Sequence, residues 1–255
     1  MGTPRSEDET ENTTVAIKLR GGVLAFGDKP VFENLDLDVP AGRITCLLGP
    51  SGAGKSSLLR MIAGLSPEAK AQILTAGDGS LIKGNIAYMD QRDLLLPWLN
   101  VLENVTLGAR LRSERPDQQK AMTFLRKGGL QKEAKALPET LSGGMRQRVA
   151  LARTLMEDRA IVLMDEPFSA MDALTRLHLQ DLAAEVLVGR TVLLVTHDPL
   201  EALRLGHRIL VLRGKPAQLA PALEPGSRPP RSAQDPTLHN LAADILRDLA
   251  GLPPT

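Results

Sequence analysis

The stretch that most constrains the fold of this chain is GPSGAGKSS, at residues 49–57. It contains the phosphate-binding pattern G-x-x-x-x-G-K-[ST]. A short apolar run at residues 44–48 precedes the pattern and predicts a buried strand, and residues 57–63 after it have helical composition. Strand, glycine loop and helix in this order predict an α/β domain with a phosphate site where the strand meets the helix.

The chemistry of the loop follows from its residue types. Glycines let consecutive backbone N–H groups turn inward around an anion, and the start of a helix adds partial positive charge. Lys55 can reach the β- and γ-phosphates of a nucleotide, and the Ser56 hydroxyl can ligate Mg²⁺. The flanking strand and helix disfavour a chance match to the pattern. The residues expected to bind the nucleotide are Gly49, Pro50, Ser51, Gly52, Ala53, Gly54, Lys55, Ser56 and Ser57.

Composition limits the other classes of function. A chain of 255 residues forms one large domain or two small ones, and 43% hydrophobic with 24% charged residues is ordinary for a globular protein. A net charge of +1 and an aromatic content of 2% argue against a nucleic-acid-binding surface. The single cysteine, Cys46, lies in the expected strand before the loop, which excludes a disulfide framework and indicates a reducing compartment.

The two ends of the chain differ in composition from its middle. Residues 1–13 are polar and acidic, and we expect a disordered tail that is not a signal peptide. Residues 216–236 are rich in proline and polar residues and predict an irregular linker. No apolar run reaches the roughly 20 residues that span a bilayer, so a membrane function would require a partner.

Strands and helices alternate along the chain, which predicts a parallel α/β sheet. Besides residues 44–48, strands are expected at 15–20, 22–26, 35–39, 72–75, 86–89, 160–164, 191–196 and 208–212, the first two being separated at Gly21-Gly22. Helices are expected at 57–63, 100–111, 116–127, 146–156, 174–188, 200–205 and 238–249. Pro116 is expected in the first turn of its helix, which Gly128-Gly129 would end.

Three further motifs carry polar chemistry. The stretch IVLMDEP at 161–167 places Asp165 and Glu166 where a strand ends, the edge at which α/β folds bind ligands, although a solvated strand end would look similar. His197 ends the next expected strand at the same edge, where a lone histidine is more often structural than catalytic. The stretch LSGGM at 141–145 opens a helix with two glycines, which predicts either an ordinary capped helix or a second phosphate-binding helix start.

Together these motifs resemble the ATP-binding subunit of an ATP-binding-cassette (ABC) transporter over about residues 14–214. The resemblance implies a phosphate-loop NTPase fold of the α/β class, with a RecA-like parallel-sheet core, an antiparallel β subdomain and an inserted α-helical subdomain at about 92–158. Residues 1–13 would be a disordered tail and residues 215–255 a proline-rich tail with a short terminal helix.

The resemblance also implies catalytic roles. Asp165, Ser56 and Gln91 would hold Mg²⁺, and Glu166 would be the general base that polarises the attacking water. His197 would contact the γ-phosphate of ATP, and Lys55 would stabilise its charge. Gln91 would link the metal site to the helical subdomain, although on its own it reads equally as a surface amide.

Other residues would complete the site from a second copy of the chain. In the family, the residues that match Ser142, Gly143 and Gly144 contact the γ-phosphate of ATP on the partner's phosphate loop, so that two ATPs lie in a head-to-tail dimer. Asp172, in the stretch SAMD, would lie at that dimer interface. The usual Gln after the two glycines is Met145 here, as in a subgroup of importers. Phe26 would stack on adenine, unless it is a core residue.

The partners are implied by an apolar stretch, DLLLPWL at 93–99, which contains the only tryptophan and suggests an interface. In the family this region docks a coupling helix of the membrane subunit. This stretch, VLENV at 101–105 and LSGGM resemble importers for nitrate, sulfonates, taurine and thiamine pyrimidine precursors, and residues 88–98 favour the thiamine-pyrimidine branch.

The resemblance therefore implies a peripheral ATPase at the cytoplasmic side of the cell membrane. Its partners would be a second copy of itself, two transmembrane permease subunits, and a periplasmic or lipoprotein solute-binding protein, with no nucleic acid. Three alternatives stay open: the cassette of an exporter, a non-catalytic regulatory subunit, and a cassette acting on DNA or the ribosome. The last is disfavoured because the chain has no coiled-coil insertion and one cassette only.

Overall fold

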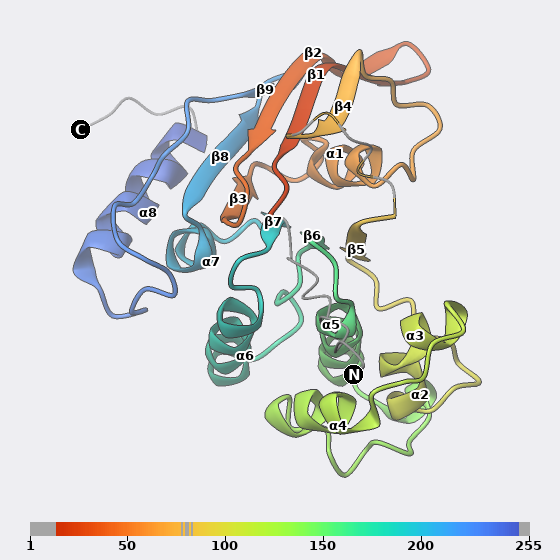
Figure 1. Ribbon diagram of the computed structural model, residues 1–255. Coiled ribbons are helices and arrows are strands. Elements are labelled where there is room, and N and C mark those ends of the chain that lie inside the picture. Colours follow the sequence, from red (N-terminus) through yellow and green to blue (C-terminus); the bar gives the residue numbers. More distant parts are fainter. Residues whose placement is uncertain (1–13, 78, 80–81, 83, 250–255) are drawn as a thin grey trace, which may run out of the picture.

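The computed structural model describes residues 14–77, 79, 82 and 84–249 (Figure 1). Its strands are β1 Ile17–Phe26, β2 Lys29–Val39, β3 Ile44–Leu48, β4 Ile73–Ala76, β5 Ile86–Met89, β6 Ile161–Asp165, β7 Thr191–Val195, β8 Arg208–Arg213 and β9 Gln218–Leu219. Its helices are α1 Lys55–Ile62, α2 Val101–Val105, α3 Leu107–Leu111, α4 Gln118–Lys127, α5 Gly143–Met156, α6 Ala173–Val186, α7 Pro199–Leu205 and α8 Pro236–Leu249, with a 3₁₀ turn, η1, at Pro138–Thr140.

The central sheet has the strand order β5-β6-β7-β3-β8-β9. The strands β5 to β8 and β3 pair in parallel, and β9 adds an antiparallel edge to β8. Every residue of β3, β6 and β7 is buried, because helices or the second sheet cover both faces. This explains why these strands are continuous apolar runs in the sequence, and it confirms the expected α/β class.

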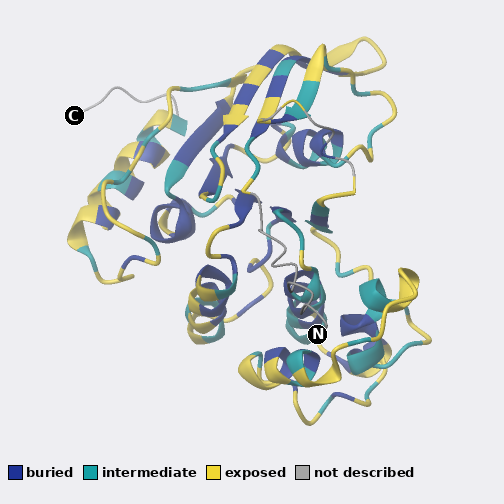
Figure 2. Ribbon diagram, in the orientation of Figure 1, coloured by how far each residue is buried: buried dark blue, intermediate teal, exposed yellow. Residues whose placement is uncertain are grey.

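Two apolar cores lie on opposite faces of the central sheet (Figure 2). On one face, Leu47 and its neighbours pack with α1 and with an antiparallel sheet of order β2-β1-β4. On the other face, Cys46 and Leu48 pack with α5, α6, α7 and α8. Successive residues of β3 thus point to opposite cores, as the pleat of a strand requires. The helices α2, α3 and α4 lie apart from the sheet, below it in Figure 1.

The antiparallel sheet differs from the sequence expectation. The break expected at Gly21-Gly22 does not end a strand, because β1 runs continuously through it. Gly21 has a φ of +60°, and the pairing register shifts between Leu19 and Gly22. A bulge of this kind absorbs the glycines without ending the strand. β2 also starts earlier than expected, at Lys29 rather than Leu35.

Three helix boundaries were also wrong. The helix expected at 100–111 divides at Thr106, whose hydroxyl donates to the Leu102 carbonyl at 2.9 Å. Asp117 caps α4, so Pro116 lies before the helix rather than in its first turn. α5 begins at Gly143 rather than at 146 because Ser142 supplies its cap.

The C-terminal segment packs against the rest of the molecule. The linker expected to be irregular contains the β9 strand, which pairs with β8, and Arg231 in it is buried. Leu238, Ala242 and Ile245 of α8 enter the core beside α7. The expected boundaries at 14, 92, 158 and 214 stay predictions. Among the described residues, no helix is both long and apolar enough to cross a bilayer.

Candidate functional site

The phosphate loop joins the end of β3 to the start of α1. Gly54 has a φ of +94°, and a Cβ there would lie 2.4 Å from Val31 Cγ1. A Cβ on Gly49 would lie 2.5 Å from the Leu212 carbonyl oxygen. Conformation and space therefore both require glycine at position 54, and the close approach of the Leu212 carbonyl requires it at position 49. The loop brings the nine expected nucleotide-binding residues, 49–57, together before the first turn of α1.

Lys55 turns its ammonium group back over this loop. Its Nζ donates hydrogen bonds to the carbonyl oxygens of Gly49 at 2.7 Å and Pro50 at 3.0 Å. Burial lowers the pKa of Lys55, while Glu166 and Asp165 oppose the shift. A cation held between loop carbonyls and two carboxylates is poised to turn onto an entering phosphate.

Asp165 ends β6 and fits a metal ion. Its side chain is fully buried, and both carboxylate oxygens lack a hydrogen-bond partner. Burial raises the pKa of Asp165, and the neighbouring Ser56 hydroxyl opposes that shift. A buried carboxylate without partners is costly unless a cation meets it. No group of three or more His, Cys, Asp or Glu in the described ranges could hold a metal, so Mg²⁺ here would depend on nucleotide oxygens as further ligands.

Glu166 and His197 meet at the carboxyl ends of β6 and β7. The His197 Nδ1 lies 3.0 Å from the Glu166 Oε2. Glu166 has a φ of +50°, a strained conformation for a residue with a side chain. Its backbone N–H donates to the Val195 carbonyl at 2.9 Å, which fixes this conformation. The two residues predicted to act together in catalysis are thus in direct contact.

Gln147 was missed by the sequence reasoning. It is 5% exposed on α5, and its Nε2 donates to the Glu166 carbonyl at 2.8 Å and to the Ser169 Oγ at 3.2 Å. Its Oε1 accepts from the Ala170 N–H at 2.8 Å. One amide thereby ties the LSGGM helix to the loop that follows the two acids. A lone glutamine among the apolar residues of α5 was the available signal.

Ser142, Gly143 and Gly144 lie at the exposed start of α5. The Ser142 hydroxyl accepts the Met145 N–H at 3.3 Å, so the residue is an N-cap as well as an exposed hydroxyl. Within the described part of one chain, the two predicted phosphate-binding segments are not joined by a hydrogen bond or an ion pair.

The remaining predicted residues are surface groups. Asp172 caps α6, and hydrogen bonds from Thr175 lower its pKa. Gln91 is exposed and lines a pocket with Gly143, Gln147 and Ser169. Phe26, at the end of β1, is 57% exposed, so the alternative that it is a core residue is wrong.

The apolar loop after Gln91 is rigidly supported. Asn104, fully buried in α2, accepts the Leu96 N–H at 2.8 Å and donates to the carbonyls of Leu96 and Leu99. Arg146 of α5 binds the Asp93 carboxylate at 3.0 Å. Trp98 is nevertheless 72% exposed. An apolar side chain held out by a buried polar network is suited to a partner surface.

The loop, the fully buried Asp165 and the adjacent Glu166–His197 pair define a phosphate-loop ATPase of the α/β class. A family described as "ABC transporter" matches residues 32–169, more than half of the chain. The chain therefore belongs to the ABC transporter family and is an ATP-binding-cassette ATPase.

Similar proteins span nearly the whole chain. The aliphatic sulfonates import ATP-binding protein SsuB 1 of Pseudomonas syringae is 41% identical over 227 residues, 88% of this chain and 92% of that protein. SsuB 1 of Paracoccus denitrificans is 44% identical over 239 residues, 92% and 93% of the two chains. Among solved structures, the dimer of the bacterial ABC transporter cassette MJ0796 has a TM-score of 0.73 at 28% identity, covering 83% of this chain and 99% of that one.

Proposed function

We propose that this chain is the ATP-hydrolysing subunit of an importer for aliphatic sulfonates and that it acts as a head-to-tail dimer. The observation that carries the dimer is the exposed start of α5, which no hydrogen bond or ion pair between described residues joins to the phosphate loop of the same chain. A second copy would supply Ser142, Gly143 and Gly144 to the ATP on this copy's loop, with Asp172 at the interface. The names of the relatives support a sulfonate over the thiamine pyrimidine precursor that residues 88–98 favour.

Each residue of the proposed site has a separate task. Lys55 and the loop amides would bind the β- and γ-phosphates, and Phe26 would stack on adenine. Glu166 would accept hydrogen bonding from the attacking water, and His197 would hold Glu166 and the γ-phosphate in register. Asp165, Ser56 and Gln91 would hold Mg²⁺, which supplies charge neutralisation on the phosphates when bound.

The membrane partners are proposed from the surface. In each copy of the chain, the loop 93–99 with Trp98 would dock one of two transmembrane permease subunits. The ATPase would then lie at the cytoplasmic face of the membrane. A solute-binding protein would deliver the solute. The expected units, 14–214 with a helical part at about 92–158 and a C-terminal part at 215–255, belong to the same proposal.

The test is uptake of ethanesulfonate by vesicles that contain this chain and the permease subunits encoded beside it. We expect ATP-dependent accumulation when a sulfonate-binding protein is supplied. Outward transport would instead indicate an exporter, and ATP hydrolysis without any transport would contradict the proposal. Taurine, nitrate and a thiamine pyrimidine precursor serve as competitors, and the degree to which each inhibits uptake shows which solute is preferred.

A further inference from the structure

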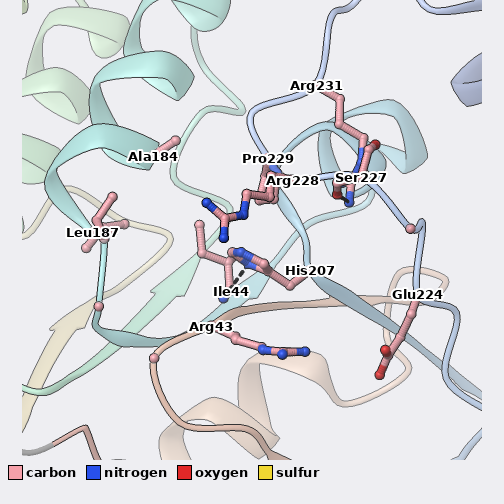
Figure 3. Close-up of a pocket in the computed structure, with 14 residues that line it drawn as sticks. Arg43, Ile44, Ala184, Leu187, His207, Glu224, Ser227, Arg228, Pro229 and Arg231 are labelled. Carbon is pink, nitrogen blue, oxygen red and sulfur yellow. Dashed lines mark hydrogen bonds between the residues drawn. The ribbon is translucent and has the colours of Figure 1, made fainter.

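A pocket of about 680 Å³ lies on the described surface away from the phosphate loop (Figure 3). It is formed where β3 and β8 begin, beside the end of α6 and the segment 224–231. The phosphate loop follows the opposite end of β3. The pocket and the nucleotide site are therefore at the two ends of one buried strand, and they share no residue.

One wall of this pocket is basic. Arg43, Arg228 and His207 line it; the Arg228 guanidinium lies beside the His207 ring and turns toward the end of α6, and the Arg43 guanidinium lies on the other side of His207 (Figure 3). Neither Arg43 nor Arg228 makes an ion pair within the described residues. Glu224 lies at the side of the pocket and is its single acidic residue. The wall therefore keeps an excess of positive charge without a bound anion.

His207 presents a hydrogen-bond donor to this wall. Its Nδ1 accepts the Ile44 N–H at 3.1 Å, which leaves the ring proton on Nε2. Burial lowers the pKa of His207, and the charges of Arg43, Arg231 and Arg228 lower it further. The ring is therefore neutral at pH 7, with one N–H free to donate.

Arg231 supports the wall without being available to a ligand. Its guanidinium is 5% exposed and donates to the carbonyls of Leu203 and Gly206 at 2.5 and 2.8 Å and to the Ser227 Oγ at 2.9 Å. These bonds hold the segment that carries Arg228 in place. The backbone that carries Arg228 is thus held in place before any ligand binds.

The opposite wall is apolar. It is made by Ala184, Leu187 and Val188 at the end of α6, and Pro229 lies beside them. Val188 is 78% exposed, so its side chain is accessible to a ligand in the pocket. A basic wall facing an apolar wall selects a ligand with an anionic head on a hydrocarbon part.

We propose that this pocket binds a small organic anion, with its oxyanion head between Arg43, His207 and Arg228 and its short alkyl part along the end of α6. Sulfonates, phosphate esters and carboxylates share the required head. The proposal does not depend on the cargo of the transporter.

The experiment is calorimetric titration of the full chain with hexanesulfonate, with saturating Mg-ADP present so that the phosphate loop is filled. We expect one site, and we expect Arg43→Gln combined with Arg228→Gln to weaken binding about tenfold or more. Arg115→Gln combined with Arg126→Gln removes two other exposed arginines and should leave the affinity unchanged. Equal binding by both double variants, or none by the unaltered chain, would overturn the proposal.

Two further probes separate the walls. Inorganic sulfate should bind several-fold more weakly than hexanesulfonate, because it lacks the alkyl part. Val188→Ser should weaken hexanesulfonate several-fold and leave sulfate unchanged. If sulfate and hexanesulfonate bind alike, the proposed ligand class is wrong. In NMR spectra, hexanesulfonate should also raise the pKa of His207.

Discussion

At the scale of single residues, the catalytic proposal rests on the contact between Glu166 and His197. Their side chains lie 3.0 Å apart, and only 16% of the Glu166 side chain is exposed. A carboxylate in this position can take up a hydrogen bond from water while the histidine fixes its direction. An amide in its place keeps the shape and loses the basicity.

The variant Glu166→Gln should therefore lose hydrolysis by about 10²-fold or more and keep ATP binding. Steady-state phosphate release measures the first, and equilibrium dialysis with ATP the second. Glu68→Gln, at an exposed position, is the matched control and should hydrolyse normally. Unchanged turnover in Glu166→Gln would remove Glu166 from the role of base.

A second residue-scale prediction concerns Glu201 in α7. Burial raises its pKa to about 7 from the ordinary 4.5, and the charge of Asp198 adds to the shift while Thr196 and Gln180 oppose it. The folded state therefore binds an extra proton between pH 4.5 and 7, so the contribution of Glu201 to stability falls as pH rises through that window.

Chemical unfolding of Glu201→Gln should show this effect. Relative to the variant, the unaltered chain should lose on the order of 3 kcal/mol of unfolding free energy between pH 4.5 and 7. Glu185→Gln, at an exposed carboxyl, should leave the pH dependence unchanged. Stability curves of Glu201→Gln and the unaltered chain that run parallel across this window would contradict the raised pKa.

The residues that the sequence predicted well are those whose role is local. Strand ends place Asp165, Glu166 and His197 at one edge, and the loop pattern places Lys55. Gln147 and Asn104 could not be found in this way, because each binds the backbone of a loop outside its own helix, after β6 for Gln147 and before α2 for Asn104. Their signal is one polar residue on an apolar helix face, which is also the pattern of an unremarkable surface position.

At the scale of elements, the start of α5 is fitted closely to the loop after β6. A Cβ on Gly144 would lie 2.7 Å from the Ala170 carbonyl oxygen, whereas a Cβ on Gly143 would meet nothing nearer than Arg146 Nη2 at 3.9 Å. Of the two adjacent glycines, therefore, only Gly144 is required by a close contact. Sequence alone gives both the same meaning.

We expect Gly144→Ala to destabilise the isolated chain by roughly 1–3 kcal/mol, because either the helix or the loop must move. Gly143→Ala should be neutral or slightly stabilising, since alanine favours the helix. Denaturant unfolding of both variants measures the difference. Equal free energies of unfolding would mean that the contact with Ala170 does not constrain α5.

Element boundaries show where local signals are incomplete. Strands such as β3, β6 and β7 were found because they are mostly apolar and the whole strand is buried. The early start of α5 and the late start of α4 depend on which polar residue caps the helix, and Ser142 and Asp117 each compete with neighbours for that position. The bulge in β1 depends on pairing with β2, which no local pattern encodes.

At the scale of the whole molecule, residues 215–249 are held to the remainder through β9, through the apolar face of α8 and through the buried guanidinium of Arg231. Arg231→Met would leave the carbonyl oxygens of Leu203 and Gly206 buried without that donor. We expect a loss of roughly 3 kcal/mol of unfolding free energy and faster proteolysis within 216–235. Arg228→Gln, three residues earlier and exposed, should change neither. An unaffected Arg231→Met variant would mean that this segment docks through β9 and α8 alone.

The largest claim at this scale is that each ATP site is shared by two copies. Ser142→Arg should reduce hydrolysis about 10²-fold or more while sparing ATP binding by the monomer, because the phosphate loop is untouched. Ser142→Asn, which preserves the helix cap, separates loss of the cap from the bulk and charge of the arginine. Loss of monomer ATP binding in Ser142→Arg would show that the two segments share one chain's site.

Mixing two inactive variants decides between a shared and a single-chain site. Lys55→Ala has a defective phosphate loop and an intact start of α5. Ser142→Arg has an intact phosphate loop and a defective start of α5. In a head-to-tail dimer of the two, one site receives both lesions and the other receives none. Random pairing should then restore up to about a quarter of the activity of the unaltered chain, whereas sites built within single chains would stay inactive in every mixture. ATP hydrolysis is measured against the mixing ratio, with each variant alone as control. A maximum of activity near equal amounts of the two variants would show that each site is built from two chains.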